Sequence, residues 1–402
     1  MTPAPTSAQR LCHLLLNGTV FGLCYRSANW FAEQQGVQRA VATAWDAQIP
    51  FLPWMLLPYA LSTVFFVASF WGVATQDALR TLSQRLLLAT VLACLVFVLF
   101  PLRFSLVRPV LGSAWWAALY AALDMLDRPY NQLPSLHVAY CCIFWAALRA
   151  RRSRPQALAL ALTLTLVAFS TLFTYQHHLP DVLAGGLLGW ACIALVRPNR
   201  DQPRVALYYT LGVGVVLVLG WVWLPWWLTA YGAVSLMLVA RAYALGDAQF
   251  LHKRDGRVPW WSWLLHGPYL LGYCLTWWAV QWWERGQPPL VQMAPHLWVG
   301  RRLTRAQARV LPPGCTVIDL ANELSETPSL RGARYRAVPL LDLVSPDAAT
   351  VERVLHLMHE ALQCGQPVYL HCAMGYSRSR QIAASYLARH PASPLHLSLI
   401  HI

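Results

Sequence analysis

The chain has 402 residues, of which 57% are hydrophobic and only 12% are charged. Soluble globular domains carry roughly 25% charged residues, so this composition excludes an ordinary soluble protein. The formal net charge of +14 does not indicate a nucleic-acid partner, because no basic run is interleaved with aromatic residues in a soluble segment. The arginines cluster between apolar segments, and many of the 20 tryptophans lie near segment ends, as in a polytopic membrane protein.

The ten cysteines show neither metal-ligand spacing nor a CxxC pair, so we expect no disulfide framework and no metal site. Most of them lie in apolar segments, where cysteine acts as a small buried residue. No small-residue cleavage site follows the first apolar stretch, so a removable signal peptide is not expected. The sequence indicates no cofactor.

A hydrocarbon core of ~30 Å needs about 20 apolar residues per helix. We expect an all-α membrane domain with about eight spans, the first of which is weakened by Asn17 and Arg26. The stretch 260–283 is interrupted by His266, Gly267 and Pro268 and is rich in tryptophan, so it suits an interfacial or re-entrant segment as well as a ninth span. The eight predicted spans are 11–30, 51–73, 86–101, 136–148, 157–175, 182–196, 205–223 and 226–244.

Loop arginines orient these spans by the positive-inside rule. Arginines follow the second, fourth and sixth spans, at 80–85, 149–154 and 197–204, so those ends and the N-terminus are predicted to be cytoplasmic. The opposite ends are then at the outer face and carry Arg103, Arg108, Asp127, His137, His177 and Asp181. An even number of spans leaves the C-terminal region in the cytoplasm, and we expect a bacterial inner-membrane protein.

After Arg285 the composition changes to the alternation of a soluble domain. Strands are predicted at 296–299, 315–320, 336–338 and 368–370, with helices at 349–363 and 378–388. Strands alternating with helices indicate an α/β domain of roughly 115 residues. The predicted division is therefore a membrane domain at 1–200, further membrane or interfacial helices at 201–285, and the α/β domain at 286–402. Residues 395–402 resemble a translated sequencing adapter, so we expect the last domain to be truncated.

The outer-face residues form a first constellation suited to phosphate esters. Such an ester needs a nucleophile, neutralisation of its oxygens and a proton for the leaving alkoxide. His177 and Asp181 are four residues apart and would share a helical face, so the carboxylate can orient one imidazole nitrogen while the other attacks phosphorus. His137 can supply the leaving-group proton, and Arg108 can clamp the phosphate. Ser135 and Ser170 add neutral donors.

These motifs, Arg108-Pro109, Pro134-Ser-Leu-His137 and Ser170-x6-His177-x3-Asp181, resemble those of the type 2 phosphatidic acid phosphatase superfamily, in particular its inositol phosphotransferase-like branch. The resemblance covers about residues 11–196. It implies a metal-independent phosphohistidine intermediate, with His177 as nucleophile, Asp181 orienting it and His137 as the acid.

Two positions depart from the superfamily pattern. Its lysine falls here at Pro101, for which Arg103 can substitute, and its third-block arginine is Thr171.

A second constellation, His371-Cys-Ala-Met-Gly-Tyr-Ser-Arg-Ser379, lies near the C-terminus. Cys372 and Arg378 have the spacing of a loop that wraps round a phosphate, and Gly375 lets the backbone approach the anion. Such a loop at a helix N-terminus lowers a thiol pKa, which favours a thiolate nucleophile at Cys372. Arg378 suits bidentate oxygen contacts, Ser379 can donate to the departing thiolate, and Ser377 belongs to the same motif.

The leaving group at this second site needs an acid from another loop. Asp342 is the first choice and Asp347 the second, while His371 is expected to orient the loop. The motif, together with 297–300 and 340–342, resembles the dual-specificity, protein tyrosine phosphatase-like family over about residues 291–389. That resemblance implies a cysteinyl-phosphate intermediate without a metal. The whole arrangement is similar to bacterial membrane proteins that fuse the two phosphatase types.

Three functions are compatible with these residues. The leading one is a bifunctional membrane phosphatase that acts on a lipid phosphate or pyrophosphate outside and on a phosphoprotein, phosphoinositide or other phosphomonoester in the cytosol. The second is a lipid head-group phosphotransferase, in which an alcohol replaces water in the second step. The third is a membrane scaffold or phosphate sensor with weakened catalysis. The expected partners are membrane lipids and phosphorylated substrates.

Overall fold

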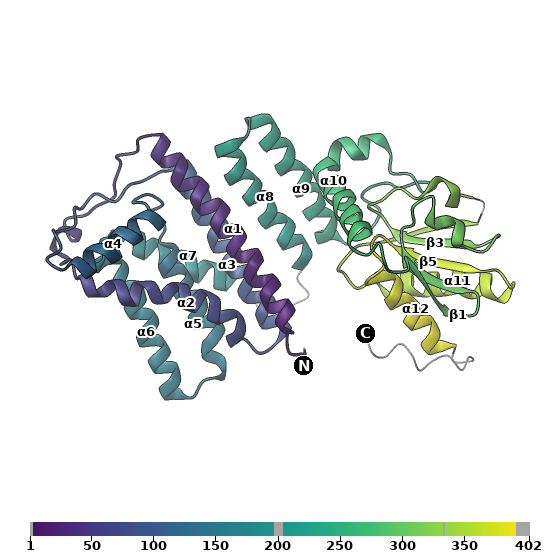
Figure 1. The fold of residues 1–402 in the computed structure, drawn as a ribbon, viewed down its shortest axis with the longest axis horizontal. Coiled ribbons are helices and arrows are strands. Elements are labelled where there is room, and N and C mark those ends of the chain that lie inside the picture. The colour runs from purple at the N-terminus through teal and green to yellow at the C-terminus, as the bar shows by residue number, and fades with distance from the viewer. Residues whose placement is uncertain (1–2, 197–203, 333, 391–402) are drawn as a thin grey trace. The chain divides into compact units, whose positions relative to one another are not determined.

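The computed structural model describes residues 3–196, 204–332 and 334–390. The chain divides into two compact units (Figure 1). The first unit comprises Met1–Gln202 and Thr210–Ala233, and the second comprises Pro203–Tyr209 and Val234–Ile402. The expected C-terminal truncation concerns residues that lie outside the described ranges.

The first unit is built from helices. Helix α3 lies at the centre, because 72% of its 18-residue apolar segment is buried inside the structure, whereas only 33% of the corresponding segments of α2 and α6 is buried. Side chains such as Phe97 of α3 and Phe144 of α5 fill the core, while Val64 and Leu162 face outward. The helices are α1 (Ser7–Gln34), α2 (Leu56–Gly72), α3 (Gln76–Leu99), α4 (Ala114–Leu126), α5 (Leu136–Leu148), α6 (Arg154–Phe173), α7 (Leu179–Leu195), α8 (Arg204–Trp223) and α9 (Trp226–Leu245), the last two shared with the second unit.

Five helical segments among the described residues are long and apolar enough to cross a bilayer. They are Pro53–Gly72, Gln76–Leu99, Arg154–Phe173, Val205–Trp223 and Trp226–Leu245. Two further expected spans, α5 and α7, are shorter apolar helices, and α1 is not among the five. The count of eight spans therefore stays a prediction.

Two local features of the first unit differ from the sequence-based expectation. The short helix α4 was not expected, because its 13 residues are too few for a span. In α1, Asn17 is buried because its side-chain amide donates hydrogen bonds to His13 O and Ser83 Oγ, both at 2.8 Å. The amide nitrogen of this polar residue is therefore paired within α1 and with α3, whereas its buried Oδ1 has no hydrogen-bond partner.

Helices α5 and α7 pack at very short range. A Cβ atom on Gly185 would lie 2.4 Å from Ser135 O, and one on Gly189 would lie 2.8 Å from Ala139 O. Small residues spaced four apart let two membrane helices approach to backbone contact. Ser135 N also donates to Asp181 O at 2.9 Å, so the start of α5 is tied to the start of α7.

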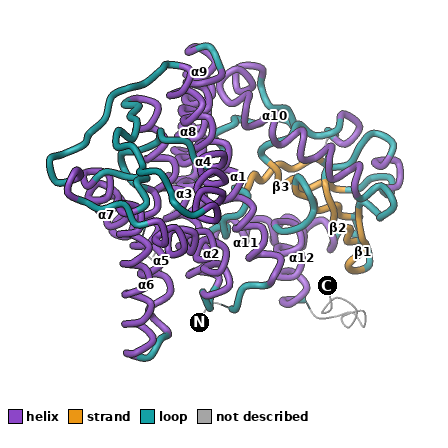
Figure 2. The backbone as a smooth tube through the Cα atoms, turned by 60° about the vertical axis from the view of Figure 1, so that its left-hand side comes forward, coloured by secondary structure: helices purple, strands orange, loops and turns teal. Residues whose placement is uncertain are grey.

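The second unit contains a five-stranded sheet, which is visible as one group of strands in Figure 2. The strand order is β1-β2-β5-β3-β4; β1 and β2 are antiparallel, and the other pairs are parallel. The four predicted strands are found, with bounds that differ by at most two residues, and β1 was not predicted. The elements are α10 (Trp260–Trp283), β1 (Leu290–Ala294), β2 (Leu297–Arg301), β3 (Thr316–Ala321), β4 (Tyr335–Leu340), α11 (Ala348–Gln363), β5 (Val368–Cys372) and α12 (Arg378–Arg389).

Helices α11 and α12 cover one face of this sheet and enclose its main core, in which Ile318, Val354 and Met358 are fully buried. The strand β5 lies in the middle, so its C-terminal end opens at the carboxyl edge between β2 and β3. Ligands of parallel sheets bind at this edge. Short 3₁₀ helices are Asp46–Gln48, Pro53–Met55, Arg149–Arg151, Gln307–Val310 and Pro328–Leu330.

Candidate active sites

The imidazoles of His137 and His177 lie close together in the first unit, with ring centroids 6.1 Å apart. His137 is the second residue of α5 and stacks on Tyr59 of α2 at 4.4 Å. His177 belongs to the segment between α6 and α7. Residues 40 positions apart in the sequence are thus brought to one place, as the first constellation requires.

The helical relation expected between His177 and Asp181 is wrong. The helix α7 begins only at Leu179, with His178 as N-cap and Pro180 in the first turn, where the missing N–H of proline costs no intrahelical hydrogen bond. Asp181 folds back to accept a hydrogen bond from His178 N at 2.8 Å. Its Oδ2 is nevertheless 3.7 Å from His177 Nδ1, so the carboxylate still faces the ring that it was expected to orient.

Buried polar atoms without a hydrogen-bond partner gather in the same two segments of the described chain. A buried polar group left unpaired costs about 1–3 kcal/mol, so each one calls for an explanation. A polar ligand or water between α5 and α7 would satisfy the whole group. These atoms are Asn131 Oδ1, Gln132 Oε1, Ser135 Oγ, Gln176 Nε2, His177 Nδ1 and Asp181 Oδ1.

The two arginines expected to bind phosphate at this site, Arg108 and Arg103, donate hydrogen bonds to other protein groups. Arg108 donates to both carboxylate oxygens of Asp124 at 2.7 and 2.9 Å and to Thr174 O at 3.3 Å. Arg103 donates to Gln38 Oε1 at 2.7 Å. Ser170 Oγ donates within its own helix to Val167 O at 2.6 Å. Ser135 Oγ differs from these groups, because it is buried without a hydrogen-bond partner.

Sequence reasoning gave no role to Asp127, which lies at the C-terminal end of α4. Its buried carboxyl group accepts hydrogen bonds from Tyr25 at 2.7 Å and from Tyr59 at 2.9 Å. Burial raises its pKa above the usual range, although both hydroxyl hydrogen bonds and His177 lower it. Because Tyr59 also stacks on His137, this carboxyl group is one side chain away from the expected acid. No motif spacing could have revealed it.

The second constellation forms one continuous loop at the end of β5. Gly375 has φ +78° and its N–H donates to Cys372 Sγ at 3.3 Å. Ser379 Oγ lies 3.4 Å from the same sulfur atom and donates to Gly300 O at 3.3 Å. Cys372 is buried, whereas Ser377, the N-cap of α12, is exposed. Donors converging on a sulfur atom at a helix N-terminus are the arrangement that stabilises a thiolate.

Arg378 is buried beneath this loop and is neutralised by two carboxylates. It donates to both oxygens of Glu323 at 3.1 and 3.2 Å and to Leu340 O at 2.8 Å. Its Nε is 3.2 Å from Asp342 Oδ1. Burial lowers the pKa of the guanidinium, but the two carboxylates outweigh that effect and raise it above the ordinary value. Glu323 was missed because it lies in an irregular loop after β3, where no motif marks it.

The two acid candidates occupy different places. Asp342 lies beside Arg378 and also accepts a hydrogen bond from Tyr273 of α10 at 2.9 Å. Asp347 instead caps α11 and accepts hydrogen bonds from Thr350 N and Oγ1 at 2.8 and 2.7 Å. The structure therefore brings Asp342, the first choice, to the cysteine loop and leaves Asp347 in a capping role.

His371 precedes the nucleophile and lies in a buried ionic cluster. Its Nε2 is 2.7 Å from Glu326 Oε2 and 3.8 Å from Asp319 Oδ1. Burial lowers the pKa of His371, but the Glu326 and Asp319 carboxylates overcome this and raise it to about 9. Three such side chains can hold a metal ion. Here Lys253 already supplies a cation, because its ammonium is 2.5 Å from Asp319 Oδ2 and 2.8 Å from Ala321 O.

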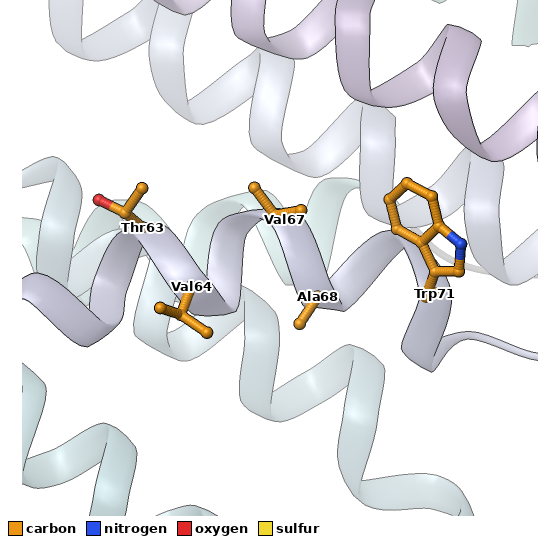
Figure 3. A pocket seen from close by; sticks show the side chains of 5 residues that line it. All are labelled: Thr63, Val64, Val67, Ala68 and Trp71. Carbon is orange, nitrogen blue, oxygen red and sulfur yellow. The ribbon is translucent and has the colours of Figure 1, made fainter.

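An apolar groove lies along the outer face of α2 and is lined by Thr63, Val64, Val67, Ala68 and Trp71 (Figure 3). It contains no nucleophile and no titratable group. Its side chains are those of a helix that meets lipid tails, so it is not a reaction site.

Comparisons with known proteins identify two regions. Residues 27–195 match the model of the PAP2 superfamily, and residues 315–392 match that of the polymorphic toxin system, DSP-PTPase phosphatase. No curated protein and no solved structure matches the chain. The first match contains all the residues of the histidine site, and the second contains the cysteine loop with Glu323 and Asp342. Both matched models describe phosphatases, which supports a hydrolase acting on phosphoric ester bonds, with a PAP2-like region followed by a DSP-PTPase-like region in one chain.

Proposed function

We propose that the protein is a bifunctional membrane phosphatase, with a PAP2-type domain at 1–200, further helices at 201–285 and a cysteine phosphatase domain at 286–402. Eight spans would leave the histidine site at the outer face of a bacterial inner membrane and the cysteine site in the cytoplasm. The single observation that carries the proposal is the clustering of the expected residues: the rings of His137 and His177 are 6.1 Å apart, and Asp342 is 3.2 Å from Arg378, which follows the Cys372 loop.

At the histidine site, His177 attacks the phosphorus of a lipid phosphate or pyrophosphate and forms a phosphohistidine. Asp181 orients the ring, and protonated His137 gives its proton to the leaving oxygen. Water then attacks the phosphohistidine and releases inorganic phosphate. Arg108, Arg103, Ser135 and Ser170 would bind the phosphate oxygens once the anion displaces their present partners.

At the cysteine site, the Cys372 thiolate attacks the phosphorus of a phosphomonoester and forms a cysteinyl phosphate. Protonated Asp342 gives its proton to the leaving oxygen, and the resulting carboxylate accepts a proton from the attacking water in the second step. Arg378 and the loop N–H groups bind the phosphate oxygens, and Ser379 donates to the departing thiolate. The close contacts of Gly375 and Ser379 with the sulfur atom support this assignment.

The test uses the full-length protein in nanodiscs, with His177→Ala, Cys372→Ser and the double variant side by side. In the Cys372→Ser background, where the cysteine site cannot contribute, lipid-phosphate turnover should fall at least ~10³-fold when His177→Ala is added, since a nucleophile is lost. Hydrolysis of a soluble chromogenic phosphomonoester should fall by a similar factor with Cys372→Ser and should be unaffected by His177→Ala. Unchanged chromogenic activity in Cys372→Ser would reject the cysteine half of the proposal, and unchanged lipid turnover in the double variant would reject the histidine half.

A further inference from the structure

The helix α10 has two different faces. Its inner face packs on the cysteine phosphatase domain, where Trp277 contacts Ala373 and Met374 of the catalytic loop in one apolar cluster. Trp277 Nε1 also donates to Arg302 O at 3.1 Å, and Tyr273 donates to Asp342 at 2.9 Å. This helix, which neither family match includes, therefore contacts both the nucleophile loop and the expected acid.

The opposite face of α10 is an unpartnered apolar stripe. Its residues recur at helical spacing, and each side chain is more than half exposed. The helix contains no charged residue. A stripe of this size on a soluble surface would be an aggregation hazard, so it needs an occupant. The stripe consists of Leu271, Leu275, Trp278 and Trp282, which follow the kink at His266.

Three observations identify that occupant as the surface of a lipid bilayer. First, α10 packs through Tyr269 and Leu270 against Tyr243 of α9, which is a candidate membrane span. Second, tryptophan prefers the boundary between hydrocarbon and water. Third, exposed arginines flank the helix at Arg254, Arg257 and Arg285, where they would attract anionic head groups.

The inner face excludes a transmembrane position for α10. If α10 spanned the bilayer, the soluble domain packed on its inner face would enter the hydrocarbon, where unpaired polar groups are costly. Trp277 and Gln281 both donate to Arg302 O of that domain, so the two cannot be separated without losing these bonds. A helix with one face on a soluble domain and the other apolar and Trp-rich belongs in the interface.

We propose that α10 is an interfacial docking helix and that the Cys372 pocket, held at the bilayer surface by it, takes the phosphomonoester head group of a membrane lipid. This inference rests on the proposed cysteine chemistry and chooses a lipid over a phosphoprotein as its substrate. The lipid oxygen leaves with the proton of Asp342, and inorganic phosphate is released into the cytoplasm.

The activity test is made in a His177→Ala background, so that the histidine site does not contribute. The substrates are phosphatidylinositol phosphate in nanodiscs and p-nitrophenyl phosphate in solution. Replacing Trp278 and Trp282 by Gln should lower kcat/KM on the lipid at least ~10-fold and change it less than ~2-fold on the soluble ester. The matched control replaces Trp45 and Trp115, which are similarly exposed at 68% and 67% but lie outside α10, and should leave both activities unchanged.

A second measurement is independent of catalysis. Photoreactive benzoylphenylalanine at Trp278 should form lipid adducts, and the same group at the exposed His356 of α11 should not.

Equal losses on both substrates, no loss on either, faster turnover of a phosphopeptide than of the lipid, or no adduct at position 278 would each overturn the inference. If p-nitrophenyl phosphate hydrolysis depends on Cys372 while no lipid is turned over, the inference fails and the proposed function stands. If that hydrolysis survives Cys372→Ser, the proposed function itself has failed.

Discussion

Gly375 allows the cysteine loop to be tested without touching a reacting atom. Its φ of +78° is rarely adopted by other residues, and a Cβ atom there would lie 2.9 Å from Arg301 N and 3.0 Å from Gly300 C. These neighbours are backbone atoms, so Gly375→Ala must move the loop. The left-handed conformation alone costs alanine roughly 1–2 kcal/mol. The shift of the loop adds to that cost and weakens the hydrogen bond from Gly375 N to Cys372 Sγ.

Gly365, which ends α11, offers a matched control. Its φ is +67°, but no atom lies within 4 Å of its Cβ position. Gly365→Ala therefore measures the conformational cost alone and should leave activity on p-nitrophenyl phosphate unchanged. Gly375→Ala should lower the thermal unfolding midpoint further and reduce kcat/KM about 100-fold, the effect of a misplacement of ~1 Å. Equal changes in stability and activity for the two variants would refute the steric argument.

Three further predictions follow from other contacts. Folding raises the pKa of His371 from 6.5 to about 9, so the protonated imidazole stabilises the folded state by about 3 kcal/mol below about pH 6.5. This stabilisation is lost as the pH rises through 9. Glu326→Gln should flatten the resulting decline in the thermal unfolding midpoint, measured across this pH range. Gly185→Val should separate α5 from α7 and abolish the lipid-phosphate turnover that remains in Cys372→Ser, and should spare p-nitrophenyl phosphate hydrolysis when Cys372 is present. Retained lipid turnover in the Gly185→Val, Cys372→Ser variant would contradict the packing argument. Tyr273→Phe should slow hydrolysis of alkyl phosphates up to ~10-fold but spare p-nitrophenyl phosphate, whose leaving group needs little help from Asp342; equal kinetic losses on both esters would exclude this role.

The two sites were not equally predictable from sequence. The cysteine loop is continuous, so its nucleophile, glycine and arginine share one local conformation, and their spacing alone specified the geometry. Asp342 was also found, because it follows a strand that had to run parallel to β5. Glu323, which binds Arg378 as closely as Asp342 does, was not found, because loop residues carry no periodic signal.

The histidine site depends on contacts between distant segments. Its motif residues were selected, but the relation between His177 and Asp181 was misassigned because α7 begins at Leu179 and leaves His177 outside the helix. Asp127 was expected at the outer face but was given no role, because its contacts follow from α4, a helix too short to be recognised as a span. Sequence patterns thus indicated which residue types meet at the site, whereas the packing of α2, α4 and α5 determines which of them share hydrogen bonds.

The helix α10 shows how one ambiguous pattern is decided by tertiary contacts. Its 24 uncharged residues are long enough to span a bilayer, and its central proline and many tryptophans also suit an interface. Periodicity cannot separate these possibilities, because both require apolar side chains on the lipid-facing surface. The hydrogen bonds from Trp277 and Gln281 to a soluble domain do separate them, since these bonds fix one face of the helix outside the hydrocarbon. An interfacial α10 adds no crossing, so the proposed eight spans before it would leave Cys372 in the cytoplasm, whose reducing conditions keep a thiol free.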